Sequence, residues 1–260
     1  MKTFIALLLV SLNAFAYNPS SKEIVIGTTP GDFAELVKDG LRPELEKKGY
    51  KVRLVEFSDY VTPNIALAQG ALDVNIFQHK PYLDQFAEEK GLKLTALSQV
   101  PTAPLGLYAG KSKALNQVKA GTTVSVPNDP SNLARGLVIL ADLKWIELPA
   151  KADLLRVTPG DIAKNLKGIK IVQLEAAQLP RSREDVDFAI INGNYATLSG
   201  LKLTEALFQE KSDAYVNWAV TKTADVKTAH IQEVQKALNS EGFKKYAKNR
   251  FKGYKLPRGW

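Results

Sequence analysis

The chain has 260 residues, of which 45% are hydrophobic, and it carries 35 basic residues, 27 acidic residues and no cysteine. This length suits one large domain or two domains of about 100–130 residues each. The absence of cysteine excludes disulfide bridges and cysteine-ligated metal sites, so the fold must be stabilised by an ordinary hydrophobic core. The formal net charge of +8 is spread along the chain and does not by itself indicate a nucleic-acid partner.

The first residues have the pattern of a secretory signal peptide. Lys2 precedes an apolar run from Phe4 to Val10, and the small-x-small tripeptide Ala14-Phe15-Ala16 follows. We therefore expect export and cleavage after residue 16. The apolar run is shorter than the roughly 20 residues that a membrane-spanning helix needs.

Short β-branched runs then alternate with helical stretches, which is typical of an α/β protein with mainly parallel sheets. Thr62 is expected to cap a helix that has Pro63 in its first turn. In the first half we expect strands at 23–27, at 51–57 and up to 77, and helices from 32, at 64–69 and from 81 to Gly91.

The second half repeats this order of elements. We expect strands at 123–127, 169–174 and 186–191 and a helix at 133–143. Two similar halves without a flexible spacer indicate lobes joined by strand crossovers. The expected division is a signal peptide at 1–16, a first lobe of 17–106 with 219–260, and a second lobe of 107–218.

The basic segment 244–258 has aromatic residues interleaved with its lysines and arginines. Such a pattern can mark a nucleic-acid or membrane-surface patch. We favour a terminal helix whose aromatic side packs on the body while the lysines face water.

Polar and aromatic side chains follow the expected strands, where open sheets bind ligands. Arg135 offers a planar fork of donors for a carboxylate, although it could instead pair with an acid on its own helix face. Amide oxygens could accept an ammonium group, although asparagines after strands are often turn formers. An aromatic slot would suit an aliphatic or thioether chain, although Phe77 could equally be a core residue. The candidates are Tyr60, Phe77, His79, Tyr82, Arg135, Asn192, Asn194 and Asn217.

Signs of catalysis or cofactor binding are missing. His79 has no second histidine at metal-ligand spacing, and neither a Gly-x-Ser-x-Gly elbow nor a phosphate-binding glycine loop occurs. We expect no cofactor, no metal and no enzymatic activity. The alternatives are an exported enzyme using His79 with Asp59 or Asp73, and an adhesin acting through the basic tail.

Four segments together resemble the NlpA lipoprotein family, the methionine-binding subunits of ABC importers: 56–61, 73–83, 126–132 and 174–181. The resemblance runs from about Ile24 almost to the end of the chain. It implies a periplasmic-binding-protein (type II-like) fold of two α/β lobes with a ligand cleft between them. It further implies a monomer that binds methionine and delivers it to an inner-membrane permease.

The resemblance also assigns roles position by position. Arg135 matches the family's carboxylate clamp, and Asn217 matches a polar contact. A further asparagine contact is Asn192 or Asn194, of which we prefer Asn192. The aromatic side-chain pocket of the family is matched by Tyr60, Phe77, His79 and Tyr82.

Two departures from the family pattern affect the expectations. The family usually carries a cysteine at the cleavage site for lipid attachment, whereas this chain has Ala16-Tyr17. We therefore expect a freely diffusing periplasmic protein without a lipid anchor. Bulk at Trp218 and at Leu133-Ala134 could retune the pocket, so another amino acid or a dipeptide is the alternative ligand.

Overall fold

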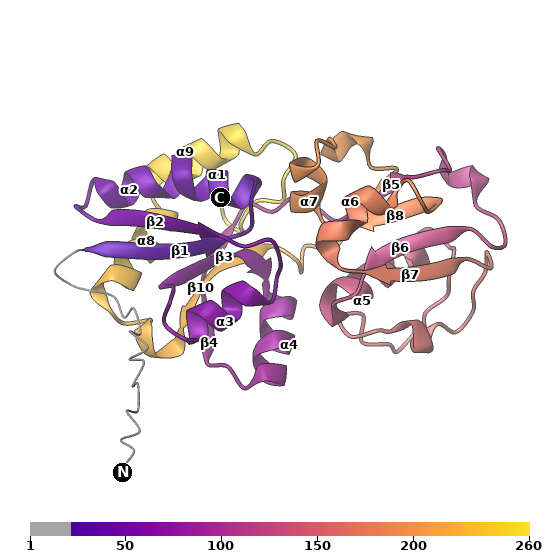
Figure 1. Ribbon diagram of the computed structural model, residues 1–260, viewed down its shortest axis with the longest axis horizontal. Coiled ribbons are helices and arrows are strands. Elements are labelled where there is room, and N and C mark those ends of the chain that lie inside the picture. The colour runs from indigo at the N-terminus through magenta and orange to yellow at the C-terminus, as the bar shows by residue number, and fades with distance from the viewer. Residues whose placement is uncertain (1–21) are drawn as a thin grey trace, which may run out of the picture.

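The computed structural model describes residues 22–260, which form two lobes that lie side by side (Figure 1). The predicted signal peptide lies outside the described residues. Within residues 22–260, no helix has the length and apolar character needed to cross a membrane. Each lobe is built on a five-stranded sheet.

The sheet of the first lobe contains strands from both ends of the chain. Its strands are β1 (Glu23–Thr28), β2 (Lys51–Glu56), β3 (Val74–His79), β4 (Leu94–Val100) and β10 (Asn217–Lys222), in the order β2-β1-β3-β10-β4. β2 and β3 run parallel to β1, whereas β10 is antiparallel to both β3 and β4. The helices are α1 (Asp32–Glu35), α2 (Arg42–Glu46), α3 (Thr62–Ala68), α4 (Lys80–Lys90), α8 (Ala229–Leu238) and α9 (Glu241–Arg250), with a π-helical segment, Leu36–Leu41, joining α1 to α2.

The second lobe has a similar arrangement. Its strands are β5 (Gly106–Ala109), β6 (Thr123–Pro127), β7 (Lys170–Leu174), β8 (Phe188–Ile191) and β9 (Phe208–Gln209), in the order β7-β6-β8-β5-β9. Its helices are α5 (Pro130–Asp142), α6 (Leu179–Ser182) and α7 (Gly193–Leu198). β6 is parallel to β7 and β8, whereas β5 is antiparallel to β8 and β9. Both sheets are therefore mixed, and the expectation of mainly parallel sheets holds only for three strands in each.

Hydrophobic cores lie on both faces of the first sheet, as the side chains of β1 show. Ile24 and Ile26 pack in the core that also contains Ile231 and Phe243 from α8 and α9. Val25 points the other way, into a core with Leu67 and Leu83. Successive side chains of a strand point to opposite faces, and burial of each aliphatic side chain stabilises the fold by about 1.5–3 kcal/mol.

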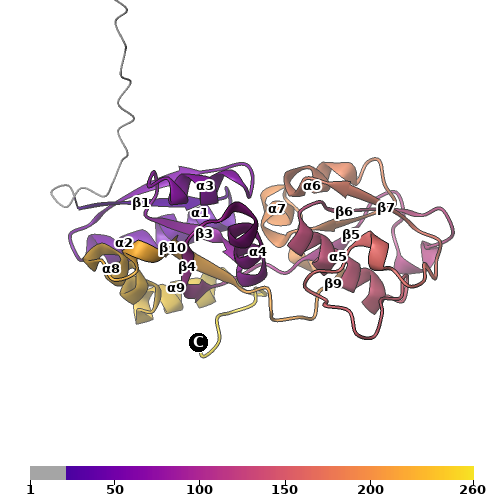
Figure 2. The same ribbon diagram turned by 90° about the horizontal axis from the view of Figure 1, so that it is seen from below.

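Three segments meet where the lobes join. The chain passes from the first lobe to the second between β4 and β5 and returns between β9 and β10. The C-terminal segment crosses the same place, because Lys255 and Thr102 exchange two backbone hydrogen bonds of 2.9 Å. In Figure 2 the end of this segment leads from the junction back below the first lobe to the C-terminus. The predicted lobe boundaries at residues 106 and 218 remain predictions.

Helix ends follow the expected chemistry with one exception. Gly91 ends α4 in the left-handed conformation, as expected for a C-terminal glycine. Thr62 is not the cap of α3, because it lies inside the helix. The carboxylate of Asp59 instead accepts hydrogen bonds from the N–H groups of Val61 and Thr62, both at 2.7 Å. The Asp59 carboxylate, three residues before Thr62, accepts from the free N–H groups at the start of the helix and so does what was expected of a capping Thr62.

The prediction for the basic terminal segment is confirmed. Phe243 and Ala247 of α9 are buried against the first lobe, whereas Lys245 and Lys248 are exposed. Phe251, just after the helix, is also buried in the same core. The aromatic residues of this segment therefore serve packing.

Gly193 tests how closely α7 approaches the crossing segment between β4 and β5. An added Cβ at this position would lie 2.4 Å from Ala103 Cβ and 2.7 Å from its carbonyl atoms. We expect Gly193→Ala to lower the free energy of unfolding by about 1–3 kcal/mol, measured by urea denaturation. Gly136→Ala is the control, because a Cβ there meets nothing closer than 3.7 Å and favours the helix. Equal stability of the two variants would contradict the close contact.

Asp187 makes the stability of the second lobe depend on pH. Its carboxylate accepts hydrogen bonds from Thr123 N–H at 2.8 Å and from Ser112 Oγ at 3.2 Å. The Thr123 N–H holds the pKa of Asp187 below its ordinary value. The charged form of Asp187 is stabilised in the folded protein. Its contribution to the free energy of unfolding is therefore present above about pH 4 and is lost as the pH falls through the lowered pKa.

We expect Asp187→Asn to reduce the free energy of unfolding by about 0.5–1 kcal/mol at pH 7. The reduction should shrink toward zero near pH 2. Urea denaturation of both proteins at the two pH values measures this difference. A difference that stays constant with pH would show that the charge of Asp187 is unimportant.

Candidate functional site

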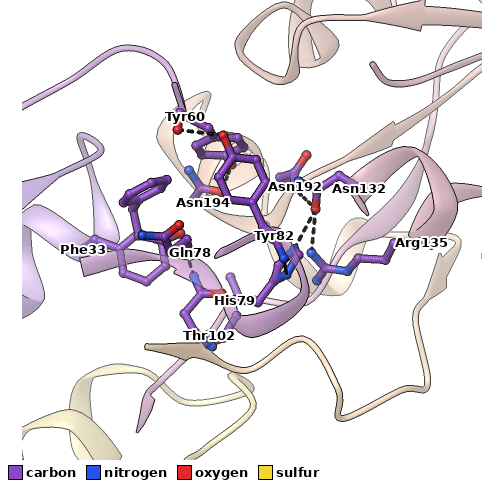
Figure 3. A pocket seen from close by; sticks show the side chains of 14 residues that line it. Phe33, Tyr60, Gln78, His79, Tyr82, Thr102, Asn132, Arg135, Asn192 and Asn194 are labelled. Carbon is purple, nitrogen blue, oxygen red and sulfur yellow. Dashed lines mark hydrogen bonds between the residues drawn. The ribbon is translucent and has the colours of Figure 1, made fainter. Parts of the chain in front are cut away.

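A narrow pocket lies between the lobes, with about 360 Å³ of space between the atoms that line it (Figure 3). The pocket is lined by side chains from both lobes. All seven predicted site residues are among them, namely Tyr60, Phe77, His79, Tyr82, Arg135, Asn192 and Asn217. The roles predicted for these residues remain predictions.

The ends of strands and the starts of helices position these side chains. His79 ends β3 just before α4, and Asn192 follows β8 just before α7. Arg135 lies in the second turn of α5, which follows β6. The two sheets therefore direct their loops and helix N-termini into one shared space, where an enclosed ligand meets both lobes.

Asn132 is the centre of a hydrogen-bond cluster that joins the lobes. Its Oδ1 atom lies 3.1 Å from His79 Nε2, 3.2 Å from Arg135 Nη1 and 3.1 Å from Asn192 Nδ2 (Figure 3). Its Nδ2 donates to both carboxylate oxygens of Asp129, at 2.9 and 3.0 Å. Three donors thus converge on one oxygen, which marks a place suited to negative charge.

His79 is neutral and has a defined tautomer. Its Nδ1 accepts a hydrogen bond of 3.2 Å from Tyr82 N–H, so the proton is on Nε2, which donates to Asn132. Burial lowers the pKa of His79 to about 3, and the positive charge of Arg135 acts in the same direction. His79 therefore serves as a hydrogen-bond donor and is a poor general base near neutral pH.

Arg135 forms a buried ion pair with an acid far away in the sequence. Its Nε and Nη2 both donate to the carboxylate of Glu210, which follows β9, and each side chain is only 4% exposed. Burial opposes the charge of Arg135, but the Glu210 carboxylate raises the pKa of Arg135 above its ordinary value. The guanidinium also lies 4.7 Å from the centre of the Tyr215 ring. Only Nη1 remains directed toward Asn132 and the pocket.

Aromatic rings form an apolar wall. Tyr60 and Phe77 are stacked with ring centres 5.8 Å apart, and Tyr82 meets both rings edge-on at 6.0 and 6.1 Å. Tyr60 OH donates to Asn194 Oδ1 at 2.7 Å, and Tyr82 OH donates to the Tyr60 carbonyl at 2.7 Å. Because these hydroxyls already have partners, the rings offer their apolar surfaces.

The two candidate asparagines differ in what their amides already bind. The Asn194 amide accepts from Tyr60 OH and donates to Thr29 Oγ1 at 3.4 Å. Asn192 donates to Asn132, but its buried Oδ1 has no hydrogen-bond partner among residues 22–260. Asn217 donates its Nδ2 to the Phe77 carbonyl at 2.9 Å. Asn192 Oδ1 is therefore a buried acceptor that can receive a hydrogen bond from a ligand.

Some pocket residues were not predicted from the sequence. Gln78 and Asn132 lie within the segments 73–83 and 126–132 that carried the family resemblance, so their positions were a usable signal. Glu210 had no such signal, because it is 75 residues from Arg135 and no spacing relates the two. Trp218, expected to retune the pocket, packs instead against the core of α3 and α4.

The chemistry of the lining residues indicates binding of a small zwitterion. No carboxylate is among the residues that line this pocket. Within residues 22–260, no group of three or more acidic or histidine side chains could hold a metal ion. The pocket offers donors at one end, a free amide oxygen and an aromatic wall, which match a carboxylate, an ammonium and an apolar tail.

Comparisons with known proteins give one consistent result. The model of the family described as NlpA lipoprotein matches residues 24–259. Outer membrane lipoprotein 3 of Mannheimia haemolytica is 38% identical and aligns with 100% of this chain and 99% of its own. The D-methionine-binding lipoprotein MetQ of Escherichia coli K12 is 37% identical over 91% of this chain and 88% of its own.

A solved structure is similar over nearly the whole described chain. It is a nutrient binding protein from Burkholderia cenocepacia bound to methionine, with a TM-score of 0.85 and 38% sequence identity. The similarity covers 90% of this chain and 99% of that protein. This confirms the predicted fold of two α/β lobes.

The comparisons contradict the prediction of a freely diffusing periplasmic protein without a lipid anchor. That prediction rested on the absence of cysteine. The matching family is one of lipoproteins, and the relatives from M. haemolytica and E. coli are both named lipoproteins. The absence of cysteine alone therefore did not justify the prediction that the protein has no lipid anchor.

The resemblance found in the sequence is confirmed. The four motifs that carried it lie within the matched residues 24–259, and the relatives align with nearly all of the chain at more than a third identity. The chain belongs to the NlpA lipoprotein family.

Proposed function

We propose that this chain is the substrate-binding protein of an ABC importer. It closes its lobes on methionine or a related small amino acid and delivers this ligand to a membrane permease. The observation that carries the proposal is the free, buried Asn192 Oδ1 close to the three donors that surround Asn132. Support comes from the E. coli relative named as D-methionine-binding and from the B. cenocepacia structure with methionine bound.

The carboxylate of the ligand binds at the donor end of the pocket. Arg135 Nη1, His79 Nε2–H and Asn192 Nδ2 already converge within 3.2 Å of one oxygen atom. A carboxylate oxygen that competes with Asn132 Oδ1 for these donors would gain charge-assisted hydrogen bonds of about 1.5–3 kcal/mol.

The ammonium group binds at the amide oxygens. Asn192 Oδ1 is buried and accepts no other bond from the described residues. Asn217 donates through its Nδ2, which leaves its Oδ1 as the atom that can accept. An ammonium has three donors, so these two oxygens satisfy most of its hydrogen-bonding capacity.

The apolar tail lies against Tyr60, Phe77 and Tyr82. Aromatic rings accept a thioether sulfur with about 0.3–1.5 kcal/mol of additional stabilisation. This favours methionine over aliphatic amino acids of similar size. A dipeptide or another amino acid would be the alternative result of a ligand screen by thermal shift, since any ligand of the folded state raises its stability.

Closure of the lobes holds the ligand. Several hydrogen bonds cross between the lobes near the pocket, including Tyr195 OH to the Ser58 carbonyl at 2.8 Å and Thr197 Oγ1 to Asp32 Oδ2 at 2.6 Å. A ligand that contacts both lobes adds to these bonds only in the closed form, so it shifts the population toward closure.

The same chemistry argues against catalysis. The pocket has no carboxylate, and Thr102, its one hydroxyl of the serine/threonine type, donates to the Val100 carbonyl and accepts from Asn217 N–H. With a neutral histidine of low basicity, the pocket lacks a nucleophile activated by a base. We therefore infer that this protein binds its ligand unchanged.

Asn192→Ala is the sharpest test of the proposed function. We expect the variant to lose at least about tenfold in methionine affinity, because one ammonium acceptor and one carboxylate donor disappear together. Titration calorimetry with L- and D-methionine measures the loss. Asn116→Ala, at an exposed position of the same lobe, is the control and should bind as the unaltered protein does. Unchanged affinity of Asn192→Ala would remove the proposed ligand position.

Arg135→Ala is a less informative variant. It leaves the buried Glu210 carboxylate without its partner, and such a change typically costs about 3–5 kcal/mol of stability. Lost binding would then not separate a missing ligand contact from a damaged fold.

The proposal also predicts how binding depends on pH. Because the pKa of His79 is about 3 in the folded protein, the imidazole stays neutral from pH 5 to pH 8. We expect methionine affinity to be constant over this range, measured by calorimetry at several pH values. An inflection near pH 6.5 that disappears in His79→Gln would show that His79 titrates in the normal range.

A further inference from the structure

We propose that Glu210 determines the charge selectivity of the pocket, because it cancels the charge of Arg135 and so makes the site prefer zwitterionic ligands over anions. This inference rests on the proposed function and names the residue that restricts the ligand to a net-neutral molecule. Glu210 itself does not line the pocket, so its role is exerted through Arg135.

Glu210 occupies two of the five N–H donors of Arg135, one on Nε and one on Nη2. Its two oxygens accept from Nε and Nη2, which are the two donors that could otherwise grip a carboxylate side-on. Only Nη1 is left for the pocket, where it lies 3.2 Å from Asn132 Oδ1. A ligand carboxylate can therefore receive one hydrogen bond from Arg135 in place of a bidentate pair.

The position of Glu210 is fixed from several sides. Its Oε1 accepts a hydrogen bond of 3.0 Å from Leu105 N–H, in the segment that enters the second lobe. Lys255 Nζ, from the C-terminal segment, lies 3.6 Å from the same oxygen. With only 4% of its side chain exposed, Glu210 cannot turn toward water.

Oppositely charged groups are paired around this end of the pocket. Arg135 and Lys255 are basic, and Glu210 lies between them, whereas the exposed Asp213 lies 3.8 Å from Lys255 on its outer side. Asp129 accepts hydrogen bonds from the main-chain and side-chain amides of Asn132, while burial raises the pKa of its carboxyl group. His79 is neutral, and the Glu210 carboxylate offsets the charge of Arg135, so the ligand meets no uncompensated cation at this end of the pocket.

Removal of one member of this set should change which ligand charge is preferred. In a water-poor site, a unit charge several ångströms from the ligand changes its binding by much more than it would in bulk water. With Glu210 neutral, the pocket gains one positive charge and should favour anions over zwitterions and cations.

The experiment uses three ligands of nearly equal shape but different charge. Methionine is a zwitterion, 2-hydroxy-4-(methylthio)butanoate carries only the carboxylate, and methioninamide carries only the ammonium. Titration calorimetry at pH 6 keeps the ammonium groups protonated. The measured quantity is the ratio of affinities among the three ligands in each variant.

For Glu210→Gln we expect the affinity of the hydroxy acid relative to methionine to rise about tenfold, and that of methioninamide to fall by a similar factor. Glu210→Asp retains the charge and should keep the ratios of the unaltered protein even where all three affinities decrease. This pair separates charge from side-chain packing.

Lys255→Met is a second variant, which keeps both members of the buried pair in place. It removes a positive charge from a side chain that is 15% exposed, so a shift of about two- to threefold in the opposite direction is expected. This variant keeps the proposal testable if Glu210→Gln fails to fold. Far-UV circular dichroism and thermal unfolding check each variant.

The outcomes are distinguishable. Opposite shifts of the ratios in Glu210→Gln and Lys255→Met support the inference. Equal losses for all three ligands in Glu210→Gln, or unchanged ratios in Lys255→Met, overturn it and leave the proposed function intact. If the unaltered protein binds none of the three ligands, the proposed function fails, and this inference fails with it.

Discussion

A guanidinium group can be buried only with a partner, and the pairing of Arg135 with Glu210 meets this requirement at the place where the lobes join. Glu210 lies where the chain leaves β9 for the first lobe, and its other contacts come from Leu105 and Lys255. The Glu210 carboxylate belongs to the segment that returns to the first lobe. It thus contacts both the other crossing segment and the C-terminal segment. The orientation of Arg135 toward the pocket is consequently linked to the geometry of the junction itself.

Neutral polar groups fill the rest of the pocket. The His79 proton, the Asn132 amide and the tyrosine hydroxyls each have defined partners, so the donors are oriented without a ligand having to order them. Preorganised groups lose little entropy on binding. Burial also raises the pKa of Tyr60 and Tyr82 and lowers that of His79, so none of these three groups changes charge near neutral pH. Such a pocket recognises shape and charge without supplying proton transfer.

The sequence predicted the parts of the structure that depend on local patterns. The strand at 123–127, the glycine at the end of α4 and the convergence of seven site residues all followed from hydrophobic runs, turn chemistry and the resemblance to a known family. Strands β4, β5, β9 and β10 were not predicted, because their neighbours in the sheets come from distant parts of the chain. The Arg135–Glu210 pair was not predicted for the same reason, since only the tertiary fold brings the two residues together. Lipid attachment was misjudged because it was argued from a single missing residue type.

The insertion of β10 between β3 and β4 affects how the protein can be made. Synthesis of the second lobe is complete before β10 leaves the ribosome, so until then β3 and β4 each keep an edge without its final neighbour. Contacts of such long sequence separation form slowly. Because the whole second lobe emerges before β10, the first lobe is the last to complete its sheet, and until then its unpaired strand edges are the surface that a chaperone would have to protect.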